Sequence, residues 1–107
     1  MDHHANIGEA IRLLEQASDL VAQPDMTGDF NRLIREARDV LEPSHMANDD
    51  AVHAWVQLDG AAPLAGPGVG ADPNYDRVLR DMAQERVEDA LGYLGAARKE
   101  LEAPSES

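Results

Sequence analysis

The chain has 107 residues and carries 21 Asp and Glu against 9 Lys and Arg, a formal charge of −12 at pH 7. The excess is spread along the chain, and Lys99 is its single lysine, so we expect an acidic surface rather than an acidic tail. Binding to nucleic-acid phosphates depends on Lys and Arg, which excludes direct nucleic-acid binding from our expectations. There is no cysteine, no apolar run long enough for a membrane span and no signal peptide, so a single-domain cytoplasmic protein is expected.

The first two predicted elements form a helical hairpin. Residues 5–22 place apolar side chains at helical spacing up to a Gln-Pro pair, and the residue before a proline avoids the helical conformation. Residues 29–42 show the clearest helical pattern of the chain, with Thr27 or Asp29 as the N-cap. Because the connector is short, we expect the two helices to pack antiparallel.

The segment 44–59 is compatible with two structures. Ser44 or Asn48 is a suitable N-cap for a short helix over 48–58. The alternation of Val52, Ala54, Val56 and Leu58 is also typical of a strand. A lone strand would lack a partner in an otherwise helical chain unless it paired across a dimer, so the helix is favoured.

Residues 60–72 are rich in glycine and proline and predict a linker, which is expected to be mobile or functional. Asp72 and Pro73 then open a long helix over 73–102 as N-cap and first helical residue. The side of this helix that carries the apolar residues shifts around the helix axis from the first half to the second. We therefore expect its two halves to face different neighbours.

The C-terminal half of the long helix carries an apolar strip that one helical hairpin is too short to cover. The strip consists of Val87, Ala90, Leu94 and Leu101. A twofold homodimer would cover it, with Trp55 as an interface anchor. The alternative is a monomer whose last helix breaks near Gly92 and folds back. The expected fold is all-α: a small helical bundle with an antiparallel hairpin, a short third helix, a linker and a long C-terminal helix, forming a dimer.

Three residues spaced by four form a candidate metal site. His45, Asp49 and His53 would share one face of a continuous helix, and two imidazoles with a carboxylate can bind a divalent metal. Acidic solvated faces produce the same spacing by chance. The metal site is therefore kept as an alternative, and no cofactor is expected.

The second predicted helix carries a short basic row formed by Arg32, Arg35 and Arg38. Arg32 is followed four residues later by Glu36, and Arg35 by Asp39, so both pairs are expected to form ion pairs along the helix. The same row could also bind an acidic partner.

The chain shows no catalytic constellation. The carboxylate pairs at 49–50 and 85–89 have no nucleophile or pocket beside them, and the glycine-rich run lacks the Lys and Ser or Thr of a phosphate-binding loop. We expect a non-enzymatic protein that acts through protein–protein contacts, with a surface charge suited to a high-salt cytoplasm. Two alternatives remain: a DNA mimic or inhibitor that binds a basic groove, and the His/Asp metal-binding protein.

Overall fold

The computed structural model describes residues 2–23, 27–64 and 73–102. Within these ranges it contains four α-helices and no strand. The helices are α1 (His3–Leu20), α2 (Thr27–Leu41), α3 (Asp49–Gly60) and α4 (Pro73–Glu102), with one short 3₁₀ helix, η1 (Glu42–Ser44), between α2 and α3. The predicted all-α fold is confirmed, and within the segment 44–59 the alternating residues belong to helix α3 rather than to a strand.

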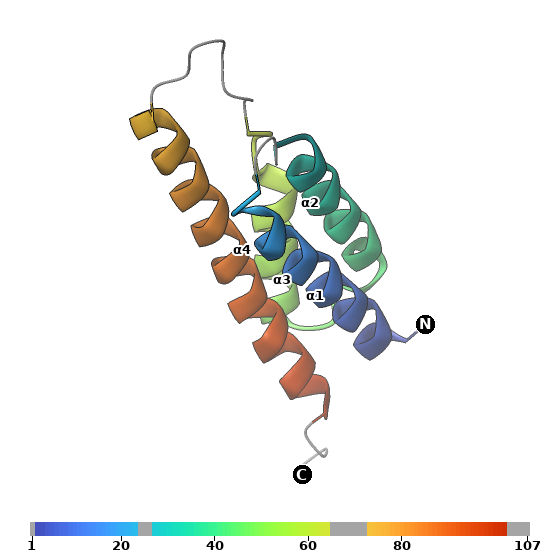
Figure 1. Cartoon of the computed structure of the whole chain (residues 1–107). Coiled ribbons are helices and arrows are strands. Elements are labelled where there is room, and N and C mark those ends of the chain that lie inside the picture. The colour runs from blue at the N-terminus through green and yellow to red at the C-terminus, as the bar shows by residue number, and fades with distance from the viewer. Residues whose placement is uncertain (1, 24–26, 65–72, 103–107) are drawn as a thin grey trace.

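The four helices alternate in direction and form an up-down-up-down bundle (Figure 1). α1 packs against α2 and α4, whereas α3 packs against α4 and less extensively against α2. At one end of the bundle His4 Nε2 lies 2.6 Å from Glu102 Oε2, which joins the start of α1 to the end of α4. This hydrogen bond lowers the pKa of the Glu102 carboxyl. No helix among the described residues has the length and hydropathy needed to cross a bilayer.

Two helices begin at side-chain caps. Asp2 accepts a hydrogen bond of 3.0 Å from the Ala5 amide, and α1 therefore begins two residues before its predicted start. Asn48 accepts one of 2.9 Å from the Ala51 amide, as predicted. The Asn48 side chain also donates to the carbonyl oxygen of Ala97 at 3.1 Å. The start of α3 is thereby fixed against α4.

The core combines large side chains from α1 and α2 with mostly small ones from α4. Phe30, Ile7, Leu14 and Leu41 are fully buried. The buried residues of α4 are Leu79, Ala83, Val87, Ala90, Leu94 and Ala97. They recur every three or four residues, so one side of α4 faces the bundle over most of its length.

The strip that was expected to need a second copy is covered within the chain. Val87, Ala90 and Leu94 are fully buried, and Leu101 is 36% exposed. Both α1 and α3 pack against α4, so α3 supplies cover that the hairpin alone would lack. The expectation that Val87, Ala90 and Leu94 need a second copy of the chain to be buried was therefore wrong. The alternative of a last helix that breaks near Gly92 and folds back is also wrong, because α4 is continuous there.

The predicted linker begins later than expected, since Gly60 is still the last residue of α3. Residues 61–64 follow without regular structure, and 65–72 lie outside the described residues. The segment 61–64 is held against α2: the Asn31 side chain donates to the Leu64 carbonyl oxygen at 2.9 Å and accepts from the Leu64 amide at 2.8 Å. Leu64 itself is buried.

Candidate functional site

The N-terminal half of α4 exposes three large apolar side chains. Tyr75, Val78 and Met82 are 42%, 51% and 48% exposed. Spacings of three and four residues place them on one side of the helix, which we call the α4 strip. The apolar surface left uncovered on α4 thus lies mainly in the half opposite to the one predicted.

The α4 strip borders a groove of about 290 Å³ between α4 and the segment that follows α3. Ala62, Pro63 and Leu64 form one wall of the groove, and the strip with Leu79 forms the other. Arg86 is the charged residue of the lining. The groove therefore presents an apolar surface with a cation at its edge.

Further along α4 the surface becomes acidic. An open depression of about 510 Å³ lies between α3 and α4, with Asp50 and Gln57 on one side and Glu88 and Asp89 on the other. Glu85 lines the stretch that leads from this depression towards the α4 strip. Within the described part of the chain, Asp50, Glu85 and Asp89 form no ion pair. These carboxylates are available to a basic partner.

Trp55, the predicted interface anchor, packs within its own chain. The centroid of its ring lies 4.5 Å from that of the His45 imidazole, and the guanidinium carbon of Arg38 lies 5.2 Å from a Trp55 ring centroid. Its Nε1–H group is buried and has no hydrogen-bond acceptor among the described residues. A role of Trp55 at an interface stays a prediction.

The three residues predicted to bind a metal do not come together. His45 precedes α3, and its Nδ1 lies 2.6 Å from the Glu42 carbonyl oxygen. His53 stacks on Tyr93 of α4, with ring centroids 5.3 Å apart. Because α3 begins only at Asp49, no continuous helix aligns the three. Across residues 2–23, 27–64 and 73–102, no group of three His, Cys, Asp or Glu side chains could hold a metal ion.

One of the two predicted ion pairs of α2 forms. Arg32 lies 3.0 Å from Glu36, as expected. The prediction of an ion pair between Arg35 and Asp39 was wrong, because Asp39 instead lies 2.7 Å from Arg38. Arg35 is therefore left without an ion pair to any residue that the structure describes.

Comparison with models of protein families, with curated proteins and with solved structures finds no match to this chain. The class of protein is therefore defined by its own fold and surface. Over the residues that the structure describes, it is an acidic four-helix bundle with an exposed apolar strip at the start of α4.

The sequence pattern predicted uncovered apolar surface on the C-terminal half of α4, whereas the exposed large apolar side chains lie mainly on the N-terminal half. The signal that could have located the α4 strip is the rotation of the apolar direction along the helix. Once Val87, Ala90 and Leu94 are assigned to the core, Val78 and Met82 lie to one side of the core line. The sequence pattern did not reveal that α3 also packs against α4.

Proposed function

We propose that this protein is a non-enzymatic interaction protein that forms a homodimer through the α4 strip. The observation that carries the proposal is the exposure of Tyr75, Val78 and Met82 on one side of α4. Grouped apolar side chains on the surface of a small protein are typical of protein–protein contacts. A second copy is a suitable occupant, because a twofold axis brings the same apolar strip to both sides of the interface.

The net charge sets the conditions under which two copies would pair. Each copy carries −12, so electrostatic repulsion opposes association at low salt. Added salt screens that repulsion and leaves the burial of apolar surface in place. We therefore propose that the dimer forms in a salt-rich cytoplasm, for which the acidic composition is suited.

Sedimentation equilibrium with Met82→Glu tests the homodimer. The wild-type protein is expected to shift from monomer towards dimer as KCl rises from about 0.1 M to about 1 M. Met82→Glu is expected to remain monomeric at both concentrations, because it places an added negative charge in the apolar contact.

Met46→Glu is the matched control. Met46 is 74% exposed and lies just before α3, at the end of the bundle opposite to the α4 strip, so this variant should dimerise like the wild type. A wild-type protein that stays monomeric at about 1 M KCl would overturn the proposal. Equal loss of the dimer in both variants would overturn it too.

A second candidate function, a DNA mimic or inhibitor, is supported by the carboxylates of Asp50, Glu85 and Asp89, which have no ion-pair partner in the described ranges. Association with a basic groove would weaken as salt rises, opposite to the homodimer. Displacement of DNA from a basic DNA-binding domain, measured by fluorescence anisotropy, tests it. Displacement at low salt that disappears when Asp50, Glu85 and Asp89 are all replaced by their amides would favour this function.

A further inference from the structure

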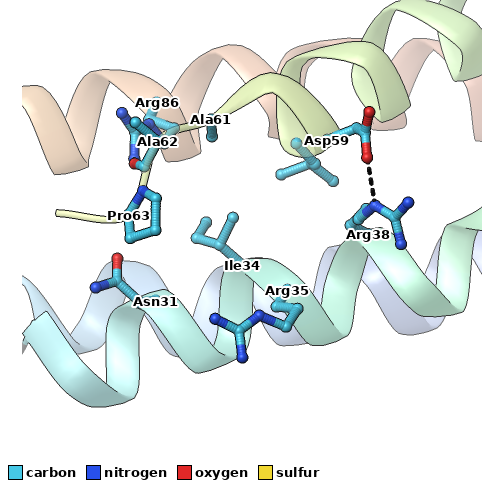
Figure 2. A pocket seen from close by; sticks show the side chains of 10 residues that line it. Asn31, Ile34, Arg35, Arg38, Asp59, Ala61, Ala62, Pro63 and Arg86 are labelled. Atoms are coloured by element: carbon cyan, nitrogen blue, oxygen red, sulfur yellow. Dashed lines mark hydrogen bonds and ion pairs between the residues drawn. The ribbon is translucent and has the colours of Figure 1, made fainter.

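A cavity of about 230 Å³ opens between α2, the end of α3 and α4 (Figure 2). Its lining includes apolar side chains from three parts of the chain: Ile34 on α2, Leu58 on α3, and Ala61 and Pro63 in the segment after α3. Leu58 is buried and Ile34 is 6% exposed. The lining of the cavity is therefore mixed, with apolar side chains beside polar ones.

The polar part of the lining is dominated by arginine. Arg35, Arg38 and Arg86 line this cavity, three of the nine cationic residues in a chain of net charge −12. Asp59 is the acidic residue of the lining. The cavity is thus a local concentration of positive charge in an acidic protein.

Arg38 is already engaged by carboxylates. Its Nε donates to Asp59 Oδ1 at 2.7 Å, which joins α2 to α3, and its Nη1 donates to Asp39 Oδ1 at 2.7 Å. These hydrogen bonds raise the pKa of Arg38, with Asp59 as the largest cause. Arg38 therefore fixes one wall of the cavity and is largely neutralised.

Arg35 and Arg86 retain unused donors. In Figure 2, Arg35 lies on the α2 side of the cavity and Arg86 near Ala62 on the other. Neither forms an ion pair with a residue in the described ranges. Arg86 Nη1 donates to the Ala62 carbonyl oxygen at 2.9 Å. A guanidinium has five N–H donors, so most of the donors of both side chains remain available.

The cavity wall between these arginines is held in place before any ligand binds. Asn31 uses both its amide nitrogen and its amide oxygen on the backbone of Leu64. The bond from Arg86 to Ala62 fixes the same segment from the other side. The backbone of this wall therefore needs little reorganisation to bind a ligand.

We propose that this cavity binds a small oxyanion, a carboxylate or phosphate group, between Arg35 and Arg86. The planar guanidinium fork matches the oxygens of both groups. The volume lies below the roughly 300 Å³ at which drug-sized sites begin, which favours inorganic phosphate or a short dicarboxylate over a nucleotide. Arg86 also lines the groove beside the α4 strip, whereas Arg35 does not, so a substitution of Arg35 tests this site without altering the surface of the proposed dimer.

Titration of ¹⁵N-labelled protein with inorganic phosphate, and separately with succinate, tests the site by two-dimensional NMR at a constant ionic strength of about 0.1 M. At least one of these anions should shift amides near Arg35, Ala62 and Arg86 to saturation. Saturation by phosphate alone assigns a phosphate group, and saturation by succinate alone assigns a dicarboxylate. Saturation by both supports general oxyanion binding.

Substitutions on one helix provide the matched control. Arg35→Gln should weaken binding by about tenfold or more, because it removes charge-assisted hydrogen bonds. Arg32→Gln removes the same charge from the outer side of α2, where Arg32 pairs with Glu36, and should leave binding unchanged. Linear shifts with both anions, or equal losses in the two variants, would overturn the proposal.

Discussion

At the scale of single residues, Ser44 connects two elements that are far apart in sequence. Its side chain is fully buried. The Ser44 hydroxyl oxygen lies 2.7 Å from His3 Nδ1 and accepts a hydrogen bond of 2.8 Å from the Asn6 side chain. One hydroxyl thus satisfies two polar groups of α1 and attaches η1 to that helix.

Ser44→Ala should therefore lower the free energy of unfolding by about 1–3 kcal/mol, because the polar groups of His3 and Asn6 lose their buried partner. Chemical denaturation measured by circular dichroism is the appropriate experiment. Ser18→Ala, at a half-buried position of α1, serves as the control and should change stability by less than about 0.5 kcal/mol. Similar losses in both variants would contradict the role of the Ser44 hydroxyl.

At the scale of elements, α4 is continuous although Gly92 and Gly95 lie in its interior. Glycine has a low helix propensity, so packing against α1 and α3 is what keeps this part of α4 helical. A Cβ atom added at Gly92 or Gly95 would meet no heavy atom within 4 Å beyond the adjacent residues and the nearby backbone of α4 itself. Both positions can therefore accept alanine without a steric cost.

Gly92→Ala is expected to raise the free energy of unfolding by about 1 kcal/mol, the difference in helix propensity between the two residues. Thermal or chemical denaturation would measure the gain. Ala96→Gly, at an exposed position of the same helix, is the mirror-image control and should lower stability by a similar amount. A neutral or destabilising Gly92→Ala would mean that α4 is not helical at this point.

At the scale of the whole molecule, the charge imbalance is not neutralised by ion pairs. The pairs Arg12–Glu9, Arg32–Glu36 and Arg98–Glu102 all involve side chains that are at least 42% exposed. Exposed pairs of this kind contribute little to stability. Even complete pairing of the 9 Lys and Arg would leave 12 of the 21 Asp and Glu in excess, and their repulsion opposes the compact state.

The melting temperature should accordingly rise as KCl increases from about 0.1 M to about 1 M, because added salt screens this repulsion. Differential scanning calorimetry at several protein concentrations separates this effect from dimerisation. A variant with Glu85, Glu88 and Asp89 replaced by their amides carries less negative charge and should show a smaller rise. A flat or falling melting temperature for the wild-type protein would contradict adaptation to salt.

The positions of the helices along the chain were recognisable from local sequence signals. α4 spans residues 73–102, the predicted range, because a proline opens it and apolar residues recur at helical spacing. Asn48, one of the two N-caps that the sequence suggested, caps α3, although the sequence left helix and strand open for that segment. Caps, prolines and periodicity act over a few residues, so they can be recognised without knowledge of the packing.

The tertiary structure alone decided which surfaces are covered and which charges are paired. Periodicity shows that Val87 and Leu94 share a side of α4, but their burial depends on how many helices pack there. Asp39 was within reach of two arginines, and it pairs with Arg38, which Asp59 of α3 also holds. The cavity beside Arg35 likewise requires α2, α3 and α4 at once. Such features depend on distances between segments remote in sequence, which no local pattern specifies.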